Sequence, residues 1–152
     1  MEHLQEIYCA YTETVNRAAQ KASPFAGILG FGDGVKNDPC HREFYDQVEK
    51  WVNAFLSHQP DAQEAAEATR FILIAAAAHK GQLTYSTCLA AQGHAQKLIP
   101  LLDQESCVAL QQEYDDLYPE HVRLPVNIQI YQMLCAGAGV KAKKKGLFSF
   151  LK

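Results

Sequence analysis

The sequence predicts an all-α protein of about six helices, in a compact bundle or an array of helix hairpins, with one long glycine-rich loop between the first two helices. Three observations indicate this class. Apolar residues recur at helical spacing along most of the chain, prolines and aspartates stand at the expected helix starts, and only one short segment alternates as a strand would. The 152 residues, 48% of them apolar, are enough for one domain that buries roughly 70% of its unfolded surface.

The first two helices are predicted from their apolar stripes and their end signals. Apolar residues follow one helix face from residue 4 to residue 18, and the helix ends before Pro24, because the residue that precedes a proline is pushed out of the helical conformation. The second helix begins with Asp38 as its N-cap and Pro39 at its first helical position. Its stripe is the strongest in the chain and comprises Phe44, Tyr45, Val48, Trp51, Val52, Phe55 and Leu56.

The third, fourth and fifth helices follow closely. Asp61 opens the third helix, which starts polar and ends almost wholly apolar, as a central helix would. The fourth is predicted over residues 84–102, and Pro100 should kink or end its last turn. Asp103 caps the fifth. The apolar face of the fourth helix comprises Cys88, Ala91, Ala95, Leu98 and Ile99, and that of the fifth comprises Cys107, Leu110, Tyr114 and Leu117.

The segment at residues 122–130 fits either a strand or a helix. Its apolar residues alternate, yet a helix that begins after Pro125 also explains the pattern, and no other segment supplies a partner strand. We therefore expect a helix that ends at Gly137 and Gly139. The predicted organisation is a helical domain over residues 1–139 and a basic, aromatic tail over residues 140–152.

Charge is divided unevenly along the chain. The net charge is −3, and the last 12 residues carry five lysines and no acid, so removing those five charges leaves −8 on the first 140 residues. A body this acidic is unsuited to nucleic acid, because affinity for nucleic acid depends on neutralising phosphates. We expect no nucleic-acid partner.

The sequence shows neither a secretion signal nor a membrane-spanning stretch, so we expect a cytoplasmic protein, with peripheral contact at the inner membrane surface as a further prediction. The five cysteines are odd in number, widely spaced and without a C-x-x-C pair. Free thiols in a reducing compartment fit this pattern.

The candidate ligand-binding or catalytic site is the glycine-rich loop together with the start of the second helix. The loop lacks the motif of a phosphate-binding loop, and its glycines are expected to serve chain reversal. Cys40 and His41 stand in the first helical turn, where unpaired N–H groups stabilise a thiolate. Because neighbouring helical residues diverge, Cys40 needs a base such as His79 or His94 from elsewhere. The residues assigned to this site are Gly32, Asp33, Gly34, Asp38, Cys40 and His41.

No metal site or cofactor is predicted, since neither H-E-x-x-H nor E-x-x-H occurs. We expect His94 to be a hydrogen-bonded core histidine. The carboxylates expected on solvated faces are Glu64, Glu67, Asp115 and Asp116.

A second polar cluster surrounds Pro119. These residues could line a groove. Alternatively the tyrosines enter the core and keep a hydrated hydroxyl group, as tyrosines at helical spacing commonly do. Its members are Tyr114, Tyr118, His121 and Arg123.

The tail combines lysines with large apolar residues, which is typical of a segment that contacts a membrane surface or a partner. A single such segment would bind a membrane weakly. The alternative is a tail that is solvated or docks on its own domain or on a neighbour. The contact residues are Lys143, Lys144, Lys145, Leu147, Phe148 and Phe150.

The absence of a complete catalytic set beside a well-patterned core favours a non-enzymatic helical module that binds a protein partner or associates with itself. One alternative is an enzyme or anion-binding protein, with Cys40 as thiolate and His41 or His94 as base. Another is a membrane-surface tether that uses the tail.

Overall fold

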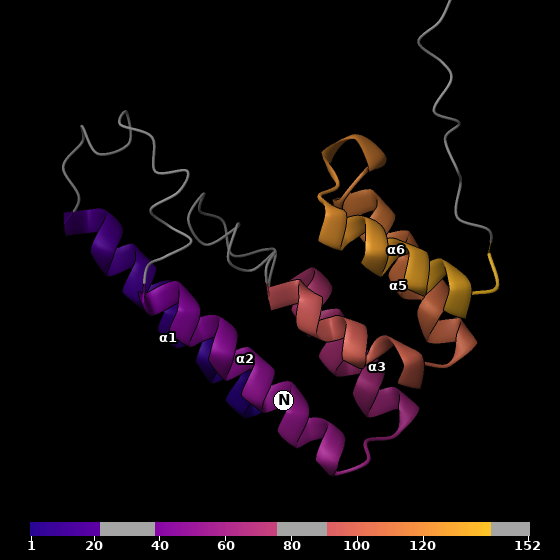
Figure 1. Cartoon of the computed structure of the whole chain (residues 1–152), viewed down its shortest axis with the longest axis horizontal. Coiled ribbons are helices and arrows are strands. Elements are labelled where there is room, and N and C mark those ends of the chain that lie inside the picture. The colour runs from indigo at the N-terminus through magenta and orange to yellow at the C-terminus, as the bar shows by residue number, and fades with distance from the viewer. Residues whose placement is uncertain (22–38, 76–90, 141–152) are drawn as a thin grey trace, which may run out of the picture.

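The computed structural model describes residues 1–21, 39–75 and 91–140, with the side chains at 15–21 and 39–40 outside that description. These residues form helices and no strand, which confirms the predicted all-α class (Figure 1). The elements are α1 (Glu2–Lys21), α2 (Pro39–Ser57), α3 (Ala62–Arg70), the π-helical turn η3 (Phe71–Ala75), the 3-10 helices η5 (Gln92–Lys97) and η6 (Ile99–Leu101), α5 (Gln104–Leu117), the 3-10 turn η7 (Glu120–Val122) and α6 (Pro125–Gly137).

The helices form two packed pairs with α3 between them. Helix α1 lies along α2, and α5 lies along α6 (Figure 1). Helix α3 contacts η6, its continuation η3 contacts α5, and η5 contacts both α2 and α6. The central elements therefore join the two pairs through one core.

Aromatic rings connect α1 and α2 to η3. The ring of Tyr8 meets Phe44 edge-on at 4.9 Å and Phe71 edge-on at 5.1 Å, while Tyr11 stacks on Phe44 at 4.2 Å. Edge-to-face and stacked arrangements are those that aromatic rings prefer. Helix α2 begins at Pro39 as predicted, and its expected cap lies outside the described residues.

Helix α3 begins with a capping box. The Asp61 side chain accepts from the Glu64 N–H at 2.8 Å, and the Glu64 side chain accepts from the Asp61 N–H at 3.0 Å. This satisfies two donors that the helix start would otherwise leave without partners. Ala65 and Ala68 are fully buried, so the small face of α3 points into the core.

The fourth predicted helix is described from residue 91, where it is largely 3-10 rather than α-helical. The Leu98 N–H bonds to the Ala95 carbonyl and the Leu101 N–H to the Leu98 carbonyl, both at 2.9 Å. Pro100 has no N–H with which to continue an α-helical ladder, and the chain turns extended at Leu102. The predicted face of Ala91, Ala95, Leu98 and Ile99 is buried.

The last two helices match their predicted ends. The Asp103 side chain caps α5 by accepting from the Ser106 N–H at 2.7 Å, and α6 begins at Pro125 and ends at Gly137. Residues 125–130 are therefore helical, as expected. The strand-like alternation does not mark one buried face, because Leu124 is 50% exposed while Ile130 is buried. Leu117, predicted to face the core, is 42% exposed, because Tyr118, four residues after the buried Tyr114, takes the inward position at the end of α5.

Candidate interaction surface

The described part of the predicted catalytic site places His41 against α1. Its Nδ1 lies 2.6 Å from the Tyr11 hydroxyl oxygen, and the two ring centroids are 5.5 Å apart. His41 is half-buried at the edge of the core. The backbone of Cys40 lies in the first turn of α2, and its side chain is outside the described part of the chain.

His94 lies in the core, as predicted, but the hydrogen bonding that was also predicted is not made at its Nε2 within the part of the chain that the structure describes. It is 4% exposed, and its ring lies 4.2 Å from the ring of Tyr45. Burial lowers its pKa below the ordinary 6.5, although the charge of Glu49 acts in the opposite direction. Its Nε2 is buried without a hydrogen-bond partner among the described residues. The side chain therefore packs as a neutral imidazole.

The other residues of the predicted site lie outside the described residues, as do the contact residues of the tail. Their assigned roles stay predictions. They are Gly32, Asp33, Gly34, Asp38, His79, Lys143, Lys144, Lys145, Leu147, Phe148 and Phe150.

Three cysteines are described, and all three are free. Cys9 is exposed, whereas Cys107 and Cys135 are buried. Burial raises the pKa of the Cys107 and Cys135 thiols. Both therefore remain protonated at neutral pH, and a protonated thiol is a poor nucleophile.

Of the two alternatives predicted for the tyrosines near Pro119, the structure shows entry into the core, where Tyr114 and Tyr118 belong to a buried polar network. The Tyr114 hydroxyl donates to Gln92 Oε1 at 3.0 Å, Gln92 Nε2 donates to the Tyr118 hydroxyl at 2.9 Å, and Asn127 Nδ2 donates to the Tyr114 hydroxyl at 2.7 Å. These side chains are at most 1% exposed. The hydrated hydroxyl expected for tyrosine is wrong here, because Gln92 and Asn127 replace water as partners.

Arg123 also belongs to the core side of this region. Its guanidinium carbon lies 3.6 Å from the centroid of the Tyr131 ring. Its Nε donates a hydrogen bond to the Tyr118 carbonyl at 2.8 Å. It pairs with Asp115 as well. The guanidinium of Arg123 is thus bound by groups of its own chain.

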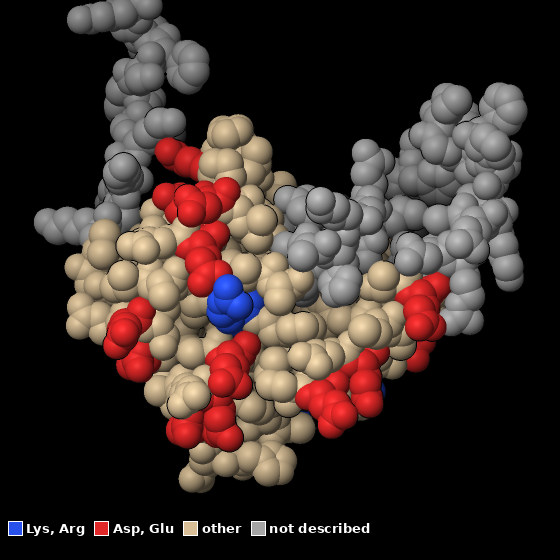
Figure 2. Space-filling model, turned by 180° about the vertical axis from the view of Figure 1, so that it is seen from behind, with Lys and Arg blue, Asp and Glu red and all other residues tan. Residues whose placement is uncertain are grey.

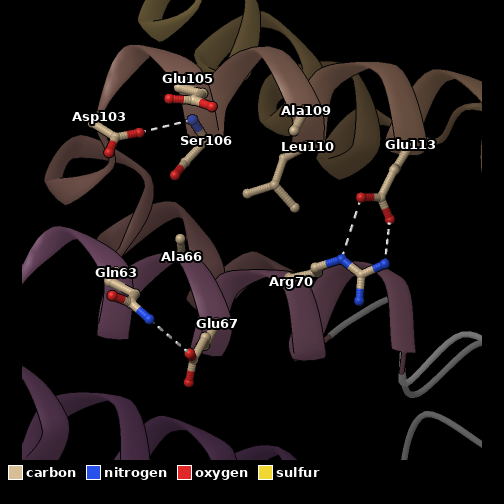
Figure 3. A pocket seen from close by; sticks show the side chains of 10 residues that line it. All are labelled: Gln63, Ala66, Glu67, Arg70, Asp103, Glu105, Ser106, Ala109, Leu110 and Glu113. Carbon is tan, nitrogen blue, oxygen red and sulfur yellow. Dashed lines mark hydrogen bonds and ion pairs between the residues drawn. The ribbon is translucent and has the colours of Figure 1, made fainter.

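The structure instead shows a groove between α3 and α5, with a volume of about 610 Å³. Ala66 of α3 and Leu110 of α5 point into it from opposite sides (Figure 3). Arg70 and Glu113 meet across one end, and Asp103 stands at the other (Figure 3). The lining residues are Gln63, Ala66, Glu67, Arg70, Asp103, Glu105, Ser106, Ala109, Leu110 and Glu113.

The groove is strongly acidic. Four carboxylates line it against one guanidinium, and that guanidinium is engaged by Glu113 through two hydrogen bonds, of 2.8 and 3.2 Å. The hydrogen bonds to Glu113 and its negative charge raise the pKa of Arg70. The hydrogen bonds that Ser106 makes to the Asp103 carboxylate lower the pKa of Asp103. Figure 2 shows the back of the molecule, where acidic side chains gather around a small basic patch. A small-residue floor under an acidic rim is suited to a basic, partly apolar segment.

Individual residues of this groove are predicted by the sequence, but the groove itself is not. Glu67 was expected on a solvated face and is exposed, and Asp103 was expected as a cap and is one. The groove depends on the spacing between α3 and α5. This spacing is set by how the two helices pack and cannot be predicted from the residue pattern within either helix. The one signal in the sequence was the charge of −8 on the first 140 residues, with five lysines in the tail.

Comparison with known proteins adds no family. No family model, no curated protein and no solved structure matches the chain. Within residues 1–21, 39–75 and 91–140, no helix is long and apolar enough to span a bilayer, and no group of three metal-ligating side chains occurs.

Proposed function

We propose that this chain is a non-enzymatic interaction module, and that it binds a cationic, partly apolar segment of a protein partner along the groove between α3 and α5. The observation that supports this proposal is the lining of the groove: four carboxylates and one engaged guanidinium around Ala66, Ala109 and Leu110. Lysine or arginine side chains would meet the rim, and apolar side chains the floor.

The shape of the groove favours an extended or helical segment over a small molecule. It is open along its length between two helices, whereas small-molecule sites commonly enclose most of the ligand. Grooves between helices commonly receive amphipathic segments, which place apolar residues at regular intervals. Its negative charge disfavours phosphate-rich ligands and speeds encounter with cationic ones.

Two of the carboxylates can be neutralised without disturbing the fold. Glu67 and Glu105 are exposed, while Asp103 caps α5 and Glu113 holds Arg70. Each exposed charge pair contributes about 0.2–1 kcal/mol, so losing two of them should weaken binding about two- to thirty-fold. The double variant Glu67→Gln/Glu105→Gln is therefore the appropriate test.

The probe is a short fluorescein-labelled peptide of alternating lysine and leucine, titrated with the full chain and followed by fluorescence anisotropy. We expect saturable binding that weakens in Glu67→Gln/Glu105→Gln. The matched control is Glu2→Gln/Glu43→Gln, which removes the same charge from exposed positions on α1 and α2 and should leave binding almost unchanged. Equal weakening in both variants would show that net charge, and not the groove, attracts the peptide, and the proposal would fail.

A further inference from the structure

The chain leaves the described fold beside the acidic groove. Helix α6 ends at Gly137, where an added Cβ atom would lie 2.4 Å from the Cys107 sulfur atom of α5. The next carbonyl, that of Ala138, accepts from Gln104 Nε2 at 3.3 Å. The end of α6 is therefore held against the first turn of α5 through Gly137 and Ala138.

That same turn supplies one end of the groove. Asp103, Glu105 and Ser106 line the groove, and Gln104 lies among them in the chain. The part of α5 that continues along the groove, from Ser106 to Glu113, spans about 10 Å at the rise of an α-helix. The groove thus begins at the same turn of α5 that the end of α6 contacts, on a neighbouring face of that helix, and extends away from it.

The remaining chain is long enough to fill the groove. Residues 141–152 number 12 and would span about 40 Å when extended or about 18 Å as a helix. Both lengths exceed the groove. The segment is therefore long enough to reach Glu113 in either conformation.

The composition of this segment matches the lining of the groove. It carries five lysines, no acid and four large apolar residues, namely Leu147, Phe148, Phe150 and Leu151. We propose that residues 141–152 occupy the α3–α5 groove of their own chain and compete there with a partner segment. This inference rests on the proposed function, because it names an internal ligand for the same site. The tail would then regulate access of the partner.

Tethering decides how strongly the tail competes. A short tether gives an effective concentration on the order of 1 mM, and we take about 0.1 mM as the dissociation constant of a contact made mainly by exposed charges. The tail then weakens partner binding about ten-fold. Salt screens exposed charges, so the effect should shrink as ionic strength rises.

The first experiment locates the tail by carbodiimide cross-linking, which joins a lysine amine to a carboxylate in direct contact. Equal amounts of unlabelled and ¹⁵N-labelled full chains are mixed, cross-linked and digested for mass spectrometry. We expect Lys143, Lys144 or Lys145 joined to Glu67 or Glu105, in peptides that carry one isotope only. Mixed-isotope products would place the tail on a second copy, and products without groove carboxylates would place it elsewhere. Either result overturns the proposal.

The second experiment separates this inference from the proposed function. The full-length variant Lys143→Gln/Lys144→Gln/Lys145→Gln should bind the lysine–leucine peptide about ten-fold more tightly than the unmodified chain. Equal binding by both chains would refute the role of the tail and leave the proposed function standing. Peptide binding by neither chain would refute both. Flotation of the unmodified chain with phosphatidylserine vesicles, together with equal peptide binding, would assign the tail to a membrane surface instead.

Discussion

The contact between α5 and α6 at Gly137 allows a quantitative test of the fold. A Cβ atom added there would lie 2.4 Å from the Cys107 sulfur and 3.3 Å from the Cys107 Cβ atom. Real carbon atoms do not approach so closely, so Gly137→Ala must move one helix or the thiol. Overpacking of this kind costs about 1–3 kcal/mol, and the gain in helix propensity is at most about 1 kcal/mol because Gly137 is the last residue of α6. We expect a net loss of about 1–2 kcal/mol in the free energy of unfolding.

A double-mutant cycle tests the cause. Cys107→Ala removes the clashing sulfur, so Gly137→Ala should cost little in that background, with a coupling energy of about 1–2 kcal/mol. Urea unfolding, followed by circular dichroism, supplies the free energies. Gly93→Ala is the matched control, because its Cβ atom would meet Val126 Cγ2 at an ordinary 3.8 Å. Additive losses within about 0.5 kcal/mol would show that the sulfur contact is not the reason.

Three further predictions follow from buried polar groups. Gln92→Leu should lower the free energy of unfolding by about 3 kcal/mol in urea titrations, because several buried partners lose a hydrogen bond; a loss under about 1 kcal/mol would contradict this. The free energy of unfolding should fall as pH drops below 6.5, because the imidazole of His94 binds a proton more readily in the unfolded chain than when it is buried in the folded one. The variant His94→Leu should therefore show a flatter pH dependence of the unfolding free energy in this range. Iodoacetamide should alkylate Cys9 in the folded chain and Cys107 and Cys135 only after urea is added; peptide mass spectrometry checks this, and labelling of all three at one rate would contradict it.

Much of the fold could be predicted because the start of each helix is determined by the residues next to it in the sequence. Pro39, Asp61, Asp103 and Pro125 each mark a start within one residue of the observed bound, since caps and prolines act through neighbouring backbone groups. The helix after Pro125 was also chosen correctly over a strand, because a strand needs a partner and the chain offered none.

What could not be predicted depends on packing between distant segments. The burial of the Tyr114 hydroxyl follows from hydrogen bonds with Gln92 and Asn127 on other elements. The apolar spacing at residues 92–97 predicted a helix without distinguishing its 3-10 form from an α-helix. The groove likewise requires Glu67 and Glu113 to be brought to one surface from helices far apart in sequence. Periodicity assigns a residue to the inside or the outside of its own helix and does not say which other helix faces it.

The hydrogen-bonded set of Gln92, Tyr114, Tyr118 and Asn127 also constrains how this sequence can diverge. Its members come from three elements and satisfy one another inside the core. Replacing one leaves the others with unmet donors or acceptors, whereas replacing all by well-packed apolar side chains removes the penalty. Substituting these residues one at a time therefore gives less stable proteins. In descendants of this chain we expect the four positions either to be retained together or to be exchanged together.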